Sequence, residues 1–449
     1  MARKDKNKKK KRILHLAVIF TFTAIVFGTA TYAWFIGMRT VNVTPFDVEI
    51  AATESLLLSL DGKTWDTTVA INSSNYSDPG TAGTYTVAKG NTNNWGGRGL
   101  IPMSSIGDID PSTNRLKLFE KGSLTTTAGG YRLMASQVNN ATTTPDGYVV
   151  FDLFIKNSSG TEYYSGYDTF NEEAIYLTTN SKVEVGSSGV ANTGIENSVR
   201  VAFAQIGRVV GTTTDESAIQ GITCNGEIGK TTGAVTSICR RAQIWEPNDK
   251  NHVVDALSWY NTTCKKRTGD NTSEATYSGA CGTVANGTAV PTYAIRKEIT
   301  SPTSVDVYDG AAFNGYSGTV TTNPDDTANS AYLYAFPYFT DTDKAKTGVE
   351  RPTFMTLAPN SITKVRVYIY IEGQDIDNYD FASIGKQIKV NFGFTKERFT
   401  ATDIDYQGPT LPQDDGPAVN NGNQSQNSDN QEPQNNGGTT PENSGNQEP

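Results

Sequence analysis

Histidine is nearly absent from this chain. Only two occur in 449 residues, and His252 is the only one beyond the N-terminal segment. The sequence also lacks H-E-x-x-H, G-x-S-x-G, a P-loop and a dinucleotide-binding fingerprint, which excludes the commonest metalloprotease, hydrolase and nucleotide-binding signatures. The carboxylate pair of a glycosidase leaves no linear signature, so that class stays open. No such pair stands out, and we expect no enzymatic activity.

Long apolar runs are missing except at the N-terminus. Residues 1–12 hold eight lysines and arginines, and residues 13–38 follow without any Asp, Glu, Lys or Arg. A basic segment before an apolar stretch predicts an export signal. The small residues Thr31 and Ala33 predict cleavage after Ala33 by a signal peptidase, with Ala30 as the second choice. The alternative is an uncleaved membrane anchor through residues 13–36, which are long enough to span a bilayer.

Positive charge is scarce after the N-terminal segment. The formal net charge is −9, although residues 1–12 carry eight cations against Asp5 alone. The remainder of the chain is therefore strongly acidic, which disfavours binding to nucleic acid or to an anionic membrane surface. An exported acidic chain is expected to be extracellular or on the cell surface.

Cysteine is also rare, with four residues and no C-x-x-C pair. Without that spacing or a histidine cluster, a zinc site is the weaker interpretation. An even number of cysteines in an exported chain indicates disulfides. We predict the bonds Cys224–Cys239 and Cys264–Cys281, because each pair brackets a short segment rich in Gly, Thr and Ser. Other pairings and free thiols remain alternatives.

Helical periodicity is weak, whereas period-two alternation of apolar residues recurs. It covers residues 149–156, 199–204, 364–371 and 388–394. This pattern predicts antiparallel strands with one face on a partner sheet and the other toward solvent. Turn-rich connections between them favour an all-β, antiparallel, jelly-roll-like β-sandwich. Residues 253–260 are a candidate short helix.

The composition predicts three parts of the chain. Residues 1–33 are the signal or anchor. Residues 34–407 are one elaborated sandwich with long loops and a disulfide-bearing insertion at about 211–290; two sandwiches are the alternative. Residues 408–449 have almost no apolar side chains, and we expect them to be disordered. The long polar segments expected to be loops are 72–99, 136–147, 211–233, 265–289 and 310–330.

Four carboxylates gather between two predicted strands, at Glu372, Asp375, Asp377 and Asp380. Oxygen-rich loops suit Ca²⁺, although the spacing is not that of an EF-hand. The sequence thus suggests calcium as the only candidate cofactor, and a solvated acidic loop is the alternative.

Three segments carry a resemblance to a known family. The signal ends in the run GTATYAWF over residues 28–35, strands are predicted at 40–44 and 46–50, and an E-G-x-D turn at 372–375 precedes the last predicted strand. Together they resemble the TasA/camelysin family of biofilm-matrix and surface-fibre proteins with SipW-type signals, particularly relatives from gut Firmicutes. The resemblance covers the two ends of the folded region. Relatives carry a cysteine in the turn where this chain has Asn378 or Tyr379.

The resemblance implies a secreted jelly-roll sandwich that polymerises. In such fibres the N-terminal strand of one subunit completes a sheet of the next by β-strand addition. The donor here would lie within residues 34–50 and present five apolar side chains: Val41, Val43, Phe46, Val48 and Ile50. The alternative is that these residues form the first strand of their own sandwich. A membrane-tethered adhesin or a carbohydrate- or peptide-binding module is the second expected function.

Overall fold

The computed structural model describes part of the chain, and the chain divides into two compact units, residues 1–419 and 420–449. All described residues belong to the first unit. They are residues 47–52, 56–71, 100–110, 112–121, 125–127, 130–132, 135–139, 147–159, 172–187, 189–224, 229–263, 265–268, 276–280, 284–290, 292–298, 333–336, 338–341, 355–378 and 387–397.

Strands dominate the described residues, as predicted, and the smaller of the two main sheets has six of them. Its order is β23-β12-β25-β1-β3, with β13 also paired to β25. β12 and β13 follow each other along one side of β25, and β1 lies on its other side. The strands are β1 (Asp47–Ala52), β3 (Thr68–Ile71), β12 (Glu173–Leu177), β13 (Lys182–Val185), β23 (Met355–Leu357) and β25 (Ile388–Glu397).

The larger sheet has eleven strands and is centred on the long strand β24 (Ser361–Glu372), which pairs with β11 (Val149–Asn157) and β14 (Val199–Val210). These long strands form where the sequence alternates with period two. The shorter strands are β2 (Leu56–Ser59), β4 (Pro102–Ser104), β7 (Phe119–Lys121), β10 (Ala135–Gln137), β15 (Thr231–Thr232), β16 (Val235–Ser237), β17 (Gln243–Glu246) and β22 (Phe339–Thr340).

The remaining described elements are small. The helices are α3 (Glu216–Gln220) and α4 (Val254–Thr263), the second of which was predicted. No described helix is long and apolar enough to cross a membrane, and residues 13–36 lie outside the described residues. The paired short strands are β5 (Ile109–Asp110) with β6 (Arg115–Leu116), β8 (Thr125–Thr127) with β9 (Gly130–Arg132), β18 (Lys265–Thr268) with β19 (Thr276–Ala280), and β20 (Tyr293–Ile295) with β21 (Leu333–Ala335).

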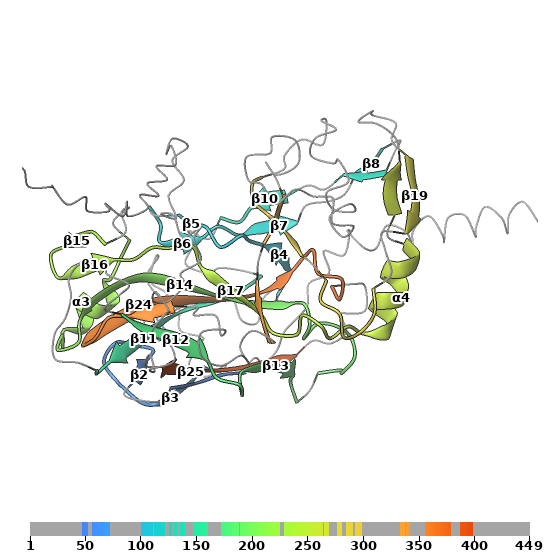
Figure 1. The fold of residues 1–449 in the computed structure, drawn as a ribbon. Coiled ribbons are helices and arrows are strands. Elements are labelled where there is room, and N and C mark those ends of the chain that lie inside the picture. The colour runs from blue at the N-terminus through green and yellow to red at the C-terminus, as the bar shows by residue number, and fades with distance from the viewer. Residues whose placement is uncertain are drawn as a thin grey trace, which may run out of the picture. The chain divides into compact units, whose positions relative to one another are not determined.

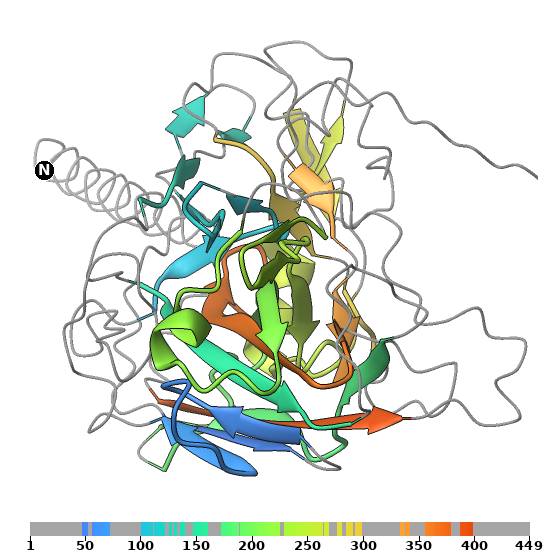
Figure 2. The ribbon, with the colours of Figure 1, turned by 90° about the vertical axis from the view of Figure 1, so that its left-hand side faces the viewer.

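The two main sheets pack face to face around one apolar core. Figure 2 shows β1, β3 and β25 in one layer and β14 and β24 in the layer above it. Phe203 of the larger sheet meets Phe392 of the smaller sheet edge-to-face, with ring centroids 5.3 Å apart. Val48, Ile50 and Val367 belong to the same buried cluster. The arrangement fits the predicted all-β sandwich, while the jelly-roll order stays a prediction.

Both sheets are mixed, which differs from the antiparallel prediction. β1 runs parallel to β25, β4 runs parallel to β24, and β22 runs parallel to β17. Parallel neighbours need long connections, and here the partners are separated by large parts of the chain. Alternation within a strand carries no information about the direction of a partner so distant in sequence, so the sequence pattern could not distinguish the two.

The outer face of the larger sheet is buried too, which corrects the prediction of half-exposed strands. Tyr368 and Tyr370 of β24 are fully buried in a second apolar cluster. Segments around β4 to β7 and around α3 cover them (Figure 1). The backbone N–H of Leu116, for example, donates to the Tyr368 hydroxyl at 3.0 Å. The segment 211–233, predicted to be a polar loop, contributes buried Ile219 and Ile222 to this cover.

A β-bulge in β14 changes which of its side chains face the core, so that Arg208 points toward the smaller sheet. The pairing with β24 shifts between Gln205 and Gly207. Beyond the shift, Arg208 donates to Glu172, which also accepts from the Thr356 hydroxyl of β23. A Cβ atom on Gly207 would lie 2.8 Å from the carbonyl oxygen of Thr236 in the neighbouring strand β16. Glycine therefore permits this close approach.

Candidate functional site

The predicted donor segment is described only from residue 47 onward. Val41, Val43 and Phe46 lie outside the described residues, as do the cleavage residues Thr31 and Ala33. Val48 and Ile50 lie in β1 and are buried in the sandwich core. The residues of β1 pair with six successive residues of β25 and, on the other side, with β3. In this structure β1 is thus an interior strand of its own sheet, which is the alternative that the sequence left open.

Alternation explains why β1 takes this place. Val48 and Ile50 point into the core, whereas the Glu49 side chain between them is 56% exposed and lies 4.0 Å from the Lys389 ammonium of β25. An exposed pair of this kind contributes little, about 0–1 kcal/mol. The slot between β25 and β3 is therefore defined by backbone pairing and by two apolar side chains.

The acidic turn after β24 is the second predicted site, and the structure brings three of its four carboxylates together. Glu372, Asp375 and Asp377 are buried, whereas Asp380 lies outside the described residues. The turn is held by its own side chains, because Asp375 accepts from the N–H of Asp377 at 2.8 Å and Glu372 from the N–H of Gln374 at 3.1 Å. The alternative of a solvated acidic loop is wrong for these three residues.

Arg200 of β14 is the cation that faces this turn, and its side chain is fully buried. Its guanidinium donates to Glu246 of β17 and to Asp375, with the Asp375 oxygen at 2.6 Å. It also donates to the Thr292 hydroxyl at 3.3 Å and lies 5.0 Å from the ring centre of Tyr338. The Nε of Arg200 is buried without a hydrogen-bond partner among the described residues, so the other contacts of the guanidinium offset its desolvation. We call the set Arg200, Glu246, Glu372, Asp375 and Asp377 the Arg200 cluster.

His252 joins the cluster at the start of α4. Its Nδ1 lies 2.8 Å from Asp377, and its Nε2 lies 2.8 Å from the carbonyl oxygen of Thr288. Asp377 also accepts from the N–H of Val253 at 2.9 Å. Burial opposes charge on His252, but Asp377 outweighs it and raises the pKa of His252. The acidic turn thereby fixes the entry into α4.

Three carboxylates of this cluster, Glu246, Glu372 and Asp377, have raised pKa values and bind protons more tightly than ordinary carboxylates do. Burial raises the pKa of Glu372 to about 7, although Arg200 acts against it. Burial also raises the pKa of Glu246 to about 7 and that of Asp377 to about 6. One arginine cannot neutralise so many buried carboxylates. Bound protons on the carboxyl groups with raised pKa values therefore reduce the remaining negative charge.

No group of three or more His, Cys, Asp or Glu among the described residues is arranged to hold a metal ion. The carboxylates of the acidic turn are directed instead toward Arg200, His252 and the Tyr338 hydroxyl, which donates to Glu372 at 3.0 Å. Calcium at this turn stays a prediction, because the fourth proposed ligand, Asp380, lies outside the described residues.

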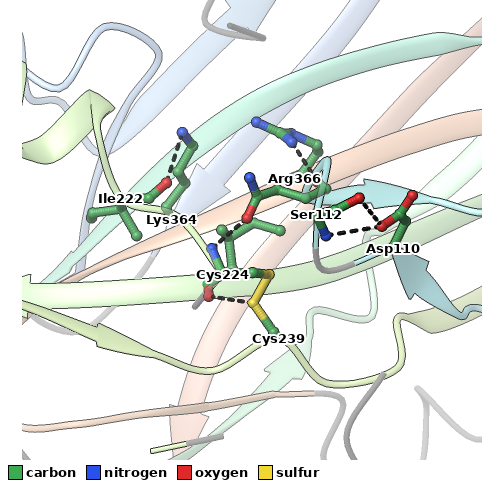
Figure 3. Close-up of a disulfide and its surroundings, with 9 residues drawn as sticks. Asp110, Ser112, Ile222, Cys224, Cys239, Lys364 and Arg366 are labelled. Atoms are coloured by element: carbon green, nitrogen blue, oxygen red, sulfur yellow. Dashed lines mark hydrogen bonds between the residues drawn. A yellow bond between two sulfur atoms is a disulfide. The ribbon is translucent and has the colours of Figure 1, made fainter. Parts of the chain in front are cut away.

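The disulfide Cys224–Cys239 forms as predicted, with Cα atoms 5.6 Å apart. Figure 3 shows it among residues of the outer face: the N–H of Cys224 donates to the Asn114 side chain, and Lys364 of β24 donates to the carbonyl oxygen of Ile222 at 3.2 Å. It therefore links two parts of the cover over β14 and β24. The other predicted pair, Cys264 and Cys281, lies outside the described residues and flanks the hairpin of β18 and β19 in sequence.

Replacing both Cys224 and Cys239 with serine should lower the free energy of unfolding by about 3 kcal/mol, because the bond closes a loop of 15 residues and restrains the unfolded chain. Urea unfolding followed by circular dichroism measures this loss. Adding a thiol reductant to the unmodified chain should lower its stability at least as much, because the reductant would also break the predicted Cys264–Cys281 bond. Equal urea midpoints for the two chains would contradict a stabilising role.

Sequence reasoning missed Arg200 and Glu246 as members of the site. The available signal was an isolated charge within apolar strands, as in the run VRVAFA at residues 199–204. A single charge in such a strand also occurs on solvent-facing positions, so the signal does not identify a partner. A scan against protein-family models and searches of curated proteins and solved structures found no match for this chain.

Proposed function

We propose that this is a secreted, non-enzymatic cell-surface or extracellular-matrix protein of jelly-roll-like type that self-assembles through β-strand addition. The observation that carries the proposal is the position of β1. The first described strand fills an interior slot between β25 and β3 and projects Val48 and Ile50 into the core. A strand at one end of the chain that fills such a slot is the element that copies of a protein can exchange at low cost.

Every copy of the chain has the same β1 and the same slot between β25 and β3, which supports the exchange of β1 between copies. A second copy of β1 presents the same two apolar side chains and the same backbone groups, so it fits a neighbour's slot as well as its own. The segment of residues 34–46 precedes β1 and lies outside the described residues; in this proposal its Val41, Val43 and Phe46 would add contacts to a neighbouring sheet. The basic and apolar N-terminus, residues 1–33, supports export ahead of assembly.

Electron microscopy tests assembly directly. The chain that begins at Trp34 should form filaments of regular width, and the chain lacking residues 34–44 should not, while its circular dichroism stays that of a β-protein. Single particles for both chains over a range of concentrations and pH would contradict self-assembly. That outcome would favour the membrane-tethered adhesin or the carbohydrate- or peptide-binding module instead.

A cross-link between β1 and β25 identifies the donor. Glu49 and Asn391 are direct partners in the parallel register, so cysteines at both positions lie in reach of one another. In filaments of the Glu49→Cys/Asn391→Cys variant, exchange of β1 predicts a ladder of multimers on a non-reducing gel. A monomer band with an internal bond would place β1 in its own subunit. Each single cysteine variant is the control for other thiol exchange.

A further inference from the structure

Three polar side chains occupy positions where an apolar one is expected. On β11 the core-facing row of Val149, Phe151, Leu153 and Ile155 ends in Asn157. On β25 the corresponding row ends in Lys396, and on β12 it begins with Glu173. The three strands belong to both sheets, so these side chains meet between them at one end of the sandwich.

The three side chains lie within hydrogen-bond distance of one another. The Lys396 ammonium is 3.1 Å from Oδ1 of Asn157 and 3.1 Å from Oε2 of Glu173. The same Glu173 oxygen accepts from Nδ2 of Asn157 at 2.6 Å. Asn157 is fully buried, and the Lys396 side chain is only 5% exposed. An amine and an amide are thus held together away from water, beside a carboxylate whose side chain is 19% exposed.

The amide of Asn157 is also oriented by its surroundings. Its Oδ1 accepts from the backbone N–H of Ser159 at 3.2 Å and lies 2.8 Å from the Ser159 hydroxyl, whose single proton is shared with Oε2 of Glu173. Its Nδ2 donates to the carbonyl oxygen of Ala358 at 3.1 Å. Donors on the carbonyl oxygen polarise the C=O bond and stabilise the charge that develops when a nucleophile adds to the carbon.

We propose that Lys396 and Asn157 join in an isopeptide bond between the two sheets, with Glu173 as the catalytic residue that moves the protons. The proposal is independent of self-assembly, because it rests on contacts inside one sandwich. It assigns a covalent modification to a chain in which the disulfides are the only other predicted cross-links.

The reaction balances without any co-reactant. Glu173 takes a proton from the Lys396 ammonium, and the freed amine adds to Cγ of Asn157, where Ser159 stabilises the oxyanion. Glu173 returns the proton to Nδ2, and the C–N bond to Nδ2 breaks as the carbonyl reforms. The leaving ammonia takes the remaining proton from the new amide nitrogen and departs as ammonium. Glu173 ends as the carboxylate with which it began.

The environment of Glu173 suits the first step. Burial alone would raise its pKa, but hydrogen bonds from Ser159, Asn157 and Lys396 outweigh burial, and the pKa of Glu173 is lowered. The carboxylate is therefore ionised before the reaction, while the lowered pKa makes it a weaker base than a free carboxylate. Close fixed geometry supplies much of the rate for a reaction between groups already in contact.

Among the described residues, Lys364 is the other buried lysine near a carboxyl group, and it lacks the partners that Lys396 has. Lys364 lies 3.2 Å from Asp152, but it also donates to the carbonyl oxygen of Gln220 at 2.7 Å. Asp152 is held by two hydrogen bonds from Arg366, at 2.7 and 3.0 Å. The contacts described for this pair include no second carboxyl group that could carry a proton, so it is an ion pair. The Lys396 group has the amide, the proton carrier and the oxyanion donors together.

Mass spectrometry of the reduced and digested full chain tests the proposal. A branched peptide that joins Asn157 to Lys396, lighter than its two parts by one ammonia, is the expected result. Recovery of the two peptides unjoined, from a folded chain, would overturn it. Because this result comes from the unmodified protein, it does not depend on whether any variant folds.

Variants then assign the roles. Lys396→Arg and Asn157→Ala remove a reacting group and should lose the branched peptide, and Glu173→Gln keeps the shape of the side chain but should lose it as well. Lys389→Arg on the same strand is the matched control and should retain it. A branched peptide that persists in Glu173→Gln would overturn the assignment of Glu173 as the catalyst.

Discussion

Replacing Arg200 with methionine should lower the free energy of unfolding by about 3–5 kcal/mol, the range for breaking a buried ion pair on one side. Methionine fills much of the same volume but leaves Glu246 and Asp375 without their cation. Arg200 is fully buried and donates to both of them. A loss of this size is a large part of the 5–15 kcal/mol or so that stabilises a typical domain. Urea unfolding at neutral pH measures it.

The control is an ion pair at the surface. Lys182 and Glu184 lie 2.6 Å apart, but their side chains are 55% and 43% exposed, so Lys182→Met should change the free energy by less than about 1 kcal/mol. Adding Glu246→Gln to Arg200→Met should recover part of the loss, because it removes one of the stranded carboxylates. Equal losses for Arg200→Met and Lys182→Met would contradict the role of the cluster.

Stability should fall as the pH rises from about 5 to 8. Burial raises the folded-state pKa of Glu372 from 4.5 to about 7, so the folded chain holds a proton that the unfolded chain releases. Such a group contributes stability that is complete below about pH 4.5 and is lost as the pH passes through about 7. At 1.36 kcal/mol per unit, Glu372 alone accounts for about 3 kcal/mol. The raised pKa values of Glu246 and His252 act in the same direction.

The loss of stability at low pH has a different origin, in the carboxylate of Asp152. Burial would raise the pKa of Asp152, but Arg366 and Lys364 outweigh burial and lower it. Its contribution is therefore lost as the pH falls below the unfolded value of 3.8, which places the maximum of stability in mild acid.

Thermal unfolding midpoints across this pH range test the dependence. Glu372→Gln should flatten the fall between about pH 5 and 8, because the amide binds no proton there. Glu49→Gln, which changes an exposed carboxylate of β1, should leave the slope as it is. A midpoint that rises with pH in the unmodified chain would contradict the raised pKa values.

The sequence predicted the long strands well, because alternation is a local property. β11, β14, β24 and β25 each carry an apolar row that needs a core. The fate of the opposite row was missed, since Arg366, Tyr368 and Tyr370 have the polarity of a solvent-facing surface. What covers them comes from segments remote in sequence, including α3. Parallel pairing of β1 with β25 was missed for the same reason.

The candidate site was predicted in part. The acidic turn was visible as a run of carboxylates, but its cation, Arg200, lies 175 residues away from Asp375 in sequence. Asn157 and Lys396 are 239 residues apart, and neither belongs to a motif. Their signal is positional: each ends an apolar row, where burial of a polar side chain requires a partner. The strand boundaries needed to recognise such positions come from the structure.

The parallel pairing of β1 and β25 determines how the sandwich would carry mechanical load. A pull on the chain before Asp47 and after Glu397 draws the two strands in opposite directions along their axes. The hydrogen bonds of the pair are then sheared together and share the force, instead of opening one after another. With Lys396 bonded to Asn157, tension that enters at the end of β25 passes directly into β11, the neighbour of the central strand β24 in the other sheet. A sandwich joined in this way would stretch very little under a load applied at these two points.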